Sequence, residues 1–179
     1  YLKEFAEARE YELIVEDNAN IGRPDAEEIH DIDEYLKTLT LTAGGELIKP
    51  RDYQLEALSH ALENKKSLLL SPTASGKSLI IYLAVRYYLE NNDGNVLLIV
   101  PTTSLVEQMY SDFADYSKSD MWNVDENCHK IYAGKEKYHI KQRVIITTWQ
   151  SIYKLQSNWF SDYGMVIGDE AHNFKAKSL

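Results

Sequence analysis

Apolar and amphipathic stretches alternate along the chain from about residue 50 onward. Short apolar runs stand within four stretches, which indicates strands buried on both faces: 67–70, 95–100, 143–148 and 165–170. Before and between these runs, apolar residues recur at helical spacing in four stretches: 51–62, 77–91, 104–116 and, more briefly, 149–155. This order predicts an α/β fold, with a parallel sheet covered by helices on both faces.

The first fifty residues follow a different pattern. Residues 1–16 indicate a helix followed by a strand, which together are too few elements to bury a core. Residues 25–41 have apolar side chains at helical spacing and acidic residues at their start, where the helix dipole favours them. We therefore expect three parts: a remnant of an accessory domain at 1–20, a linker and helix at 21–49, and the main domain at 50–179.

Composition limits the function classes. The chain has 179 residues, of which 44% are hydrophobic and 26% charged, as expected for a globular protein. Its one cysteine excludes an internal disulfide, and its longest apolar run, 79–85, is far shorter than the roughly 20 residues of a membrane span. These features predict a cytoplasmic protein, in the host cytoplasm if the source is viral. Because the chain begins with Tyr1, we expect a fragment or a processed chain.

The charge is unevenly distributed. The net charge of −9 arises mainly from residues 1–50, which carry 5 basic and 13 acidic side chains, against 14 and 15 in residues 51–179. Residues 130–143 contain five basic residues and one acidic residue, with Tyr132 and Tyr138 between them. Basic and aromatic residues together are typical of nucleic-acid contacts, although a solvated loop would have the same composition.

The stretch "SPTASGKS" (71–78) lies between a predicted strand and a predicted helix. It matches the phosphate-loop pattern at Gly76, Lys77 and Ser78, with Ser71 in place of the first glycine. Backbone N–H groups at a helix start bind phosphates, Lys77 would neutralise them, and the Ser78 hydroxyl would bind Mg²⁺. The alternative is a serine-rich turn that caps the helix. The position between strand and helix favours an ATP site.

Asp169 and Glu170 end the last predicted strand, in the sequence "DEAH" (169–172). Asp169 would hold Mg²⁺ and Glu170 would polarise the attacking water. A solvated acidic pair is the alternative, but a phosphate loop in the same alternating fold favours the catalytic interpretation.

The stretch "PRDYQ" (50–54) precedes the loop. The amide of Gln54 can pair with the N6/N7 edge of adenine, and Arg51 or Tyr53 could pack on the base. An ordinary helix start explains these residues equally well.

The order of "PRDYQ", "SPTASGKS", "VPTTSL", "TTWQ" and "DEAH" resembles the first motifs of superfamily 2 helicases. The longer stretches "VRYYLEN" (85–91), "IVPTTSLVEQMYSDFADY" (99–116), "ITTWQS" (146–151) and "NWFSDYGM" (158–165) are similar to the UvsW-type DNA helicases of large tailed bacteriophages. The similarity runs through nearly the whole chain and is weaker before residue 50. It implies a RecA-like P-loop NTPase domain of an ATP-dependent helicase.

The resemblance also implies residue roles. Gln54 would read adenine, Asp169 would serve Mg²⁺, Glu170 would serve the water, and His172 would link the site to DNA-contacting motifs or to a second motor domain. The phosphates would be surrounded by Thr73, Ala74, Ser75, Gly76, Lys77 and Ser78. Ala74 departs from the glycine of many relatives. Backbone contacts to nucleic acid would come from Pro101, Thr102, Thr103, Thr147 and Thr148, which can position phosphates without reading bases.

The family implies that the whole protein unwinds or branch-migrates branched DNA, including Holliday junctions, forks, D-loops and RNA–DNA hybrids, in recombination, repair and replication. The family also implies a second RecA-like domain, which would supply arginines to the transferring phosphoryl group and which we expect to be missing from this chain. We therefore expect negligible ATP turnover by the chain alone. Three alternatives stay open: an RNA helicase, a restriction-type translocase on duplex DNA, and a non-catalytic module that binds nucleotide or DNA.

Overall fold

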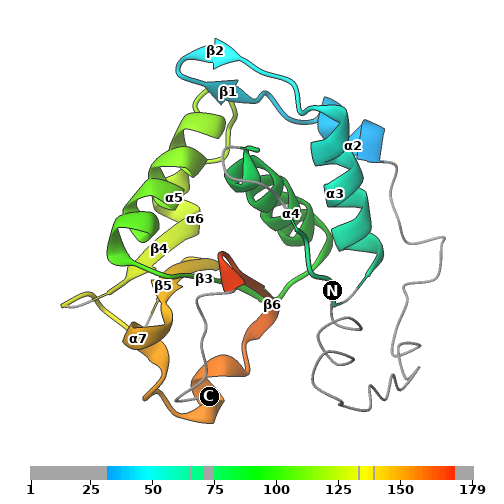
Figure 1. Ribbon diagram of the computed structural model, residues 1–179. Helices are drawn as coiled ribbons and strands as arrows, with labels where there is room; N and C mark the ends of the chain where they lie inside the picture. Colours follow the sequence, from blue (N-terminus) through cyan, green and yellow to red (C-terminus); the bar gives the residue numbers. More distant parts are fainter. Residues whose placement is uncertain (1–31, 65, 71–74, 133, 139, 172–179) are drawn as a thin grey trace, which may run out of the picture.

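The computed structural model describes residues 32–64, 66–70, 75–132, 134–138 and 140–171. At its centre is a four-stranded parallel sheet in the order β4-β5-β3-β6 (Figure 1). The strands are β3 (Asn95–Val100), β4 (Cys128–Ile131), β5 (Val144–Thr148) and β6 (Tyr163–Gly168). The α/β fold with a parallel sheet, expected from the alternating pattern, is confirmed.

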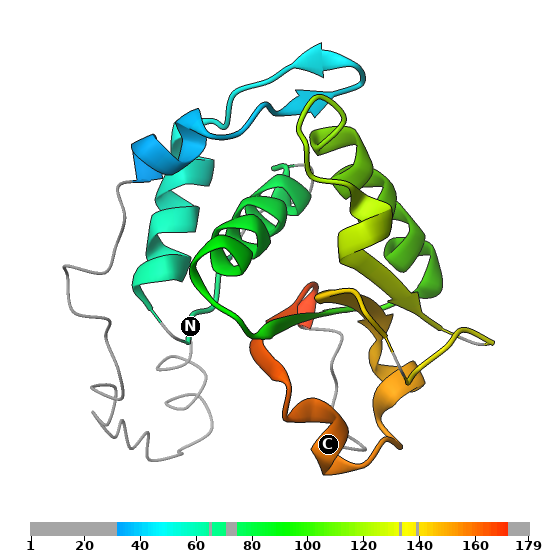
Figure 2. The ribbon, with the colours of Figure 1, turned by 180° about the vertical axis from the view of Figure 1, so that it is seen from behind.

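Helices cover both faces of this sheet, as predicted. One face packs on α4 (Lys77–Asn91) and α5 (Thr103–Tyr116), and the other on α7 (Trp149–Ile152) and the 3-10 helix η1 (Ser157–Phe160), as Figures 1 and 2 show. Successive residues of β3 alternate between the two sides: Val96 and Leu98 belong to the larger core, and Leu97 to the smaller one. This alternation explains why apolar residues fill the whole strand.

The N-terminal elements lie at the edge of the larger core. They are α2 (Ile32–Lys37), the hairpin strands β1 (Thr42–Ala43) and β2 (Glu46–Leu47), and α3 (Asp52–Glu63). Tyr35 donates a hydrogen bond to the carbonyl of Leu83 on α4 (2.9 Å). Asp115, near the end of α5, receives hydrogen bonds from the Thr42 hydroxyl at its carbonyl and from the Gly44 N–H at its carboxylate. The hairpin is therefore attached to α5.

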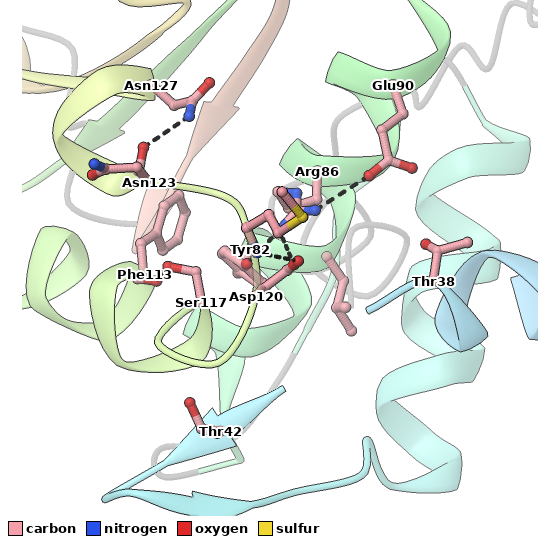
Figure 3. Close-up of polar contacts among 12 residues, drawn as sticks. Thr38, Thr42, Tyr82, Arg86, Glu90, Phe113, Ser117, Asp120, Asn123 and Asn127 are labelled. Carbon is pink, nitrogen blue, oxygen red and sulfur yellow. Dashed lines mark hydrogen bonds and ion pairs between the residues drawn. The ribbon is translucent and has the colours of Figure 1, made fainter. Parts of the chain in front are cut away.

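A buried arginine joins α4 to the connection between α5 and the short helix α6 (Val124–Asn127). Arg86, 7% exposed, donates hydrogen bonds to Asp120 and to the Tyr82 hydroxyl, both at 2.7 Å, and pairs with Glu90 at 3.4 Å (Figure 3). Its guanidinium also lies 5.1 Å from the ring centroid of Trp122. Because a buried charge must be paired, this cluster determines how the connection packs on α4.

Three expectations about local structure need correction or completion. The predicted strand at 67–70 is wrong: these residues pair with no strand in the described part of the chain, and Leu68 and Leu70 are 72% and 90% exposed. Strand β4 and the hairpin β1–β2 were not predicted. The helix expected at 25–41 is described only from residue 32, and there it ends at Lys37. The elements predicted in residues 1–16 lie outside the described residues.

The apolar run 67–70 predicted a buried strand, but a strand also needs a neighbouring strand to accept its hydrogen bonds. Strand β6 is at the edge of the sheet: among the described residues it pairs only with β3, and Val166 on β6 is 61% exposed. No described helix has the length and apolar character that a membrane crossing requires.

Candidate functional site

The site begins where α4 starts. Gly76 is the N-cap of α4 and has a φ of 76°, a left-handed conformation that favours glycine. A Cβ at Gly76 would lie 2.5 Å from the Gln54 side-chain nitrogen. The glycine of the predicted phosphate loop is thus required by its backbone angle and by the close approach of α3.

Helix α3 binds the end of the loop through two side chains. The Tyr53 hydroxyl donates to the Ser75 carbonyl at 2.8 Å, and the Gln54 Nε2 donates to the same carbonyl at 3.1 Å. The Gln54 Oε1 accepts from the Arg51 N–H at 2.9 Å, and the whole side chain is 5% exposed. Adenine recognition by Gln54 stays a prediction: in the structure its amide is bonded to Ser75 and Arg51, and Oε1 keeps a second lone pair. Arg51 and Tyr53 are exposed beside it.

The structure brings the loop and the acidic pair together. The Lys77 ammonium forms a hydrogen-bonded ion pair with the Glu170 carboxylate, 93 residues further along the chain. This hydrogen bond raises the pKa of Lys77 above its ordinary value. Each side chain is about one-third exposed, 30% and 31%, so a polyphosphate can reach the ammonium. The predicted phosphate loop and the acidic pair are therefore in direct contact, through Lys77 and Glu170.

Glu170 has an unusual backbone conformation. Its φ of 51° makes it the one residue other than glycine, among those that the structure describes, with a positive φ. This conformation costs an L-residue roughly 1–2 kcal/mol. Strain of this kind clusters at functional sites, where the surrounding structure enforces it. Here the Glu170 N–H donates to the Asp169 carboxylate at 2.9 Å, which stabilises the turn after β6.

Asp169 extends the pairing between β6 and β3 by one residue. Its N–H donates to the Ile99 carbonyl of β3 at 2.9 Å, so it is positioned by backbone pairing. Burial raises the pKa of its carboxyl group above the ordinary value, because desolvation disfavours the charged form. A cation beside it would have the opposite effect.

Two residues that the sequence analysis did not identify lie beside Ser78. The Ser78 hydroxyl is 2.8 Å from the Tyr116 hydroxyl at the end of α5, and the Asp112 carboxyl also bonds to Ser78. A serine oxygen keeps a lone pair while it donates, so these contacts leave it able to bind a cation. No sequence pattern indicates this contact, because the partners lie on another helix.

The backbone of Gly76 provides a test of this arrangement. Gly76→Ala adds strain from the positive φ and pushes the new Cβ against Gln54, so we expect unfolding to require about 1–3 kcal/mol less than in the parent. Chemical denaturation would measure this difference. Gly134→Ala is a matched control, because Gly134 has a φ of 82° and no atom within 4 Å of its added Cβ. Equal losses in both variants would show that the contact with Gln54 is unimportant.

The predicted nucleic-acid residues lie at the ends of β3 and β5. Thr102 is the exposed N-cap of α5, with its hydroxyl accepting from the Leu105 N–H at 3.3 Å, and Thr103 is exposed beside it. Pro101 is half-buried. Thr147 and Thr148, by contrast, are buried: the Thr147 hydroxyl donates to the Ile131 carbonyl, and the Thr148 hydroxyl bonds to Ser151. Contacts to DNA by these five residues stay predictions, and the side chain of Thr147 is committed to the sheet.

The basic residues of 130–143 are largely used inside the protein. Lys130 pairs with Glu107 at 2.7 Å, and the Tyr132 hydroxyl bonds to the same carboxylate. Lys137 donates to the Ser151 carbonyl at 2.8 Å, and Arg143 donates to backbone carbonyls at the end of α4. The charge cluster in the sequence therefore overstates the charge available to a ligand. Of the remaining site residues, Ser71, Thr73, Ala74 and His172 lie outside the described residues.

Comparison with known proteins identifies the family. The family model described as "Type III restriction enzyme, res subunit" matches residues 47–179, which is most of the chain. The chain belongs to this family. It is 41% identical to the "ATP-dependent DNA helicase uvsW" of Enterobacteria phage T4 over 152 residues, which cover 83% of the chain and 30% of that relative. A second relative, the "ATP-dependent DNA helicase Hel308" of Pyrococcus abyssi, is 31% identical over 79% of the chain and 20% of its own length.

Solved structures agree with this family. The crystal structure of the UvsW helicase from bacteriophage T4 matches 96% of the chain and 60% of its own length, with a TM-score of 0.75 and 36% identity. The resemblance to UvsW-type superfamily 2 helicases and the RecA-like fold are thus confirmed. The chain spans less than a third of the curated relatives' length, as the 30% and 20% coverages show.

Proposed function

We propose that the chain carries the ATP site of a DNA helicase of the UvsW type. The contact between Lys77 and Glu170 supports this proposal most directly, because it joins the loop that would hold phosphates to the carboxylate that would activate water. The two relatives described as ATP-dependent DNA helicases share most of the chain's length.

The chemistry we propose is in-line attack of water on the γ-phosphate of ATP. The Lys77 ammonium leaves Glu170 and neutralises phosphate oxygens, and the freed Glu170 carboxylate orients the water and accepts its proton. N–H groups at the start of α4 provide further donors for the phosphates. Tyr53 and Gln54 hold the loop by the Ser75 carbonyl, which fixes the position of Lys77 relative to α3.

The residues present also suit Mg²⁺. The hydroxyl of Ser78 and the carboxylate of Asp169 are hard oxygen ligands, the type that Mg²⁺ prefers. The described residues contain no cluster of three or more His, Cys, Asp or Glu side chains that could hold a metal, which fits an ion bound by one or two protein groups and by the nucleotide's phosphates. When bound, the ion would supply charge neutralisation to the β- and γ-phosphates.

We further propose that the whole protein couples this hydrolysis to movement on branched DNA, such as Holliday junctions, forks, D-loops and RNA–DNA hybrids. Residues 50–179 would form the first motor domain, with exposed Thr102 and Thr103 touching the phosphate backbone. A second RecA-like domain would close on Glu170 during each cycle. Unwinding assays on matched DNA and RNA duplexes would separate this activity from that of an RNA helicase.

A duplex translocase is a second candidate, because the matched family model is named for a restriction enzyme subunit. Such a protein would move along duplex DNA and leave the strands paired. Displacement of a triplex-forming strand without release of a single strand would support the translocase and contradict the helicase.

Replacing Lys77 tests the nucleotide site itself. We expect Lys77→Ala to raise the dissociation constant for ATP at least about tenfold, because charge-assisted hydrogen bonds contribute roughly 1.5–3 kcal/mol. Titration with a fluorescent ATP analogue would measure it. Lys118→Ala, which removes an exposed charge near the end of α5, is the matched control. Unchanged nucleotide affinity in Lys77→Ala would refute the assignment of the loop.

A further inference from the structure

Two exposed tyrosines lie in neighbouring segments at one edge of the sheet. Tyr138, in the connection that follows β4, is 56% exposed, and Tyr153, directly after α7, is 46% exposed. Figures 1 and 2 show this connection extending past the sheet next to α7. Within the described part of the chain neither hydroxyl forms a hydrogen bond, so no hydrogen bond accounts for the exposed position of these rings.

Hydrogen bonds hold the two segments together. Lys137 donates from its ammonium to the Ser151 carbonyl of α7 at 2.8 Å, and its own carbonyl accepts from the Trp159 indole N–H at 2.8 Å. Tyr138 is the next residue after Lys137, and Tyr153 lies two residues after Ser151. The tyrosines therefore flank a fixed contact, and their separation is limited by a few residues of backbone.

Positive charge accompanies these rings. Residues 128–161 contain six lysines and arginines and one acidic residue, Glu136, and three of the six, Lys130, Lys137 and Arg143, have the intramolecular partners described above. The Glu136 carboxylate accepts from the N–H groups of Lys137 and Tyr138, so part of its capacity is used by its own turn. Lys135 and Lys154 are exposed, and each lies over a tyrosine ring, that of Tyr132 at 5.4 Å and that of Tyr153 at 5.3 Å. The carboxylate of Glu107 is near enough to Lys135 to offset part of its positive charge.

The position of this surface fits an extended strand. In a parallel sheet all strands end at the same edge, so the segments that follow β3, β5 and β4 succeed one another along it. Thr102 and Thr103 follow β3, Tyr153 follows β5 by way of α7, and Tyr138 belongs to the connection after β4. A single strand that crosses the exposed threonines would reach the tyrosines next.

We propose that Tyr138 and Tyr153 stack on bases of single-stranded nucleic acid, with Lys135 and Lys154 beside its phosphates. Exposed aromatic rings between lysines suit this ligand because every base has a face that can stack, whatever the sequence. The inference rests on the proposed function, and it adds base stacking to the backbone contacts proposed there. DNA and RNA single strands share this chemistry.

Fluorescence anisotropy with a short labelled oligothymidylate at low salt tests the proposal. Stacking contributes roughly 1–3 kcal/mol per base, so we expect Tyr138→Ala and Tyr153→Ala each to raise the dissociation constant about tenfold. Tyr138→Phe and Tyr153→Phe, which keep the ring, should bind as the parent does. Lys154→Ala should weaken binding and reduce its salt dependence, whereas Lys118→Ala should change neither. Circular dichroism would confirm that every variant is folded.

A ligand lacking bases separates stacking from charge. An abasic oligomer with the same phosphates should bind the parent about as weakly as oligothymidylate binds the double tyrosine variant. Equal binding of the abasic and thymine oligomers, or parent-like affinity in both alanine variants, would overturn the proposal. An oligouridylate arm shows whether RNA is bound as well as DNA.

Failure of this inference differs from failure of the proposed function. A chain that binds ATP through Lys77 but binds oligothymidylate without help from the tyrosines keeps the function and loses the stacking surface. Tyrosine-dependent binding of oligothymidylate without any ATP binding would support the stacking surface and contradict the proposed ATP site.

Discussion

Glu170→Gln should abolish ATP hydrolysis in the full-length protein and leave ATP binding intact. An amide cannot accept the proton of the attacking water, and general-base catalysis typically contributes about 10²- to 10⁴-fold. We expect ATP affinity to rise slightly, because Lys77 would no longer be paired with a carboxylate before phosphate arrives. Partly exposed ion pairs contribute about 0.2–1 kcal/mol, which corresponds to a few-fold change at most.

Two measurements distinguish this outcome from a general loss of structure. DNA-stimulated phosphate release would report hydrolysis, and titration with a fluorescent nucleotide would report binding. Glu63→Gln, at the exposed end of α3, removes a carboxylate outside the site and should change neither. Near-normal hydrolysis by Glu170→Gln would exclude Glu170 as the base. Weakened binding would contradict the view that its ion pair with Lys77 competes with the nucleotide.

Asp120→Ala should lower the free energy of unfolding by about 3 kcal/mol, because removing one partner leaves a buried charge uncompensated. Arg86 and Asp120 have side chains that are 8% and 15% exposed, and they join α4 to the segment between α5 and α6. Glu90 remains as a partner of Arg86, but it is more distant at 3.4 Å and 41% exposed. Denaturation with urea would measure the change.

A second variant separates the cost of burying the Arg86 charge from its attraction to Asp120. Arg86→Met combined with Asp120→Ala removes both charges and keeps an apolar stem beside Trp122, so the double variant should recover much of the lost stability. Lys130→Met with Glu107→Gln is a control, since that pair is more exposed and its removal should change stability much less. A loss below about 1 kcal/mol in Asp120→Ala would contradict the importance of the buried pair.

Patterns that depend on one element were predicted well from the sequence. The apolar spacing of residues 77–91 predicted α4 with the observed bounds, and the run 95–100 predicted β3. Both elements are fixed by their own side chains, which fill a core on one or both sides. The prediction at 67–70 failed because a strand also needs a partner, and the described residues provide none. Strand β4 was missed because His129 and Lys130 interrupt its apolar residues.

The site was predictable to a similar degree. Its motifs located Lys77 and Glu170, and the fold placed them in contact. The role of Gln54 could not be foreseen, because its buried amide depends on how closely α3 approaches Gly76. Nor could the contact of Ser78 with Tyr116, since it depends on how α4 and α5 pack. The number of basic residues in 130–143 also overstated the charge available to nucleic acid, because Lys130, Lys137 and Arg143 have intramolecular partners.

In the proposed motor, the order of the strands would set the distance over which force is transmitted. Asp169 bonds to β3 at Ile99, and Thr148 pairs with β3 at Val100, so the proposed ATP site and the proposed nucleic-acid contacts are separated by a single intervening strand. At roughly 5 Å per strand, that separation is about 10 Å across continuous backbone hydrogen bonds. Such a short, stiff connection would let a small displacement at Glu170 move the bound strand without a hinge inside this domain.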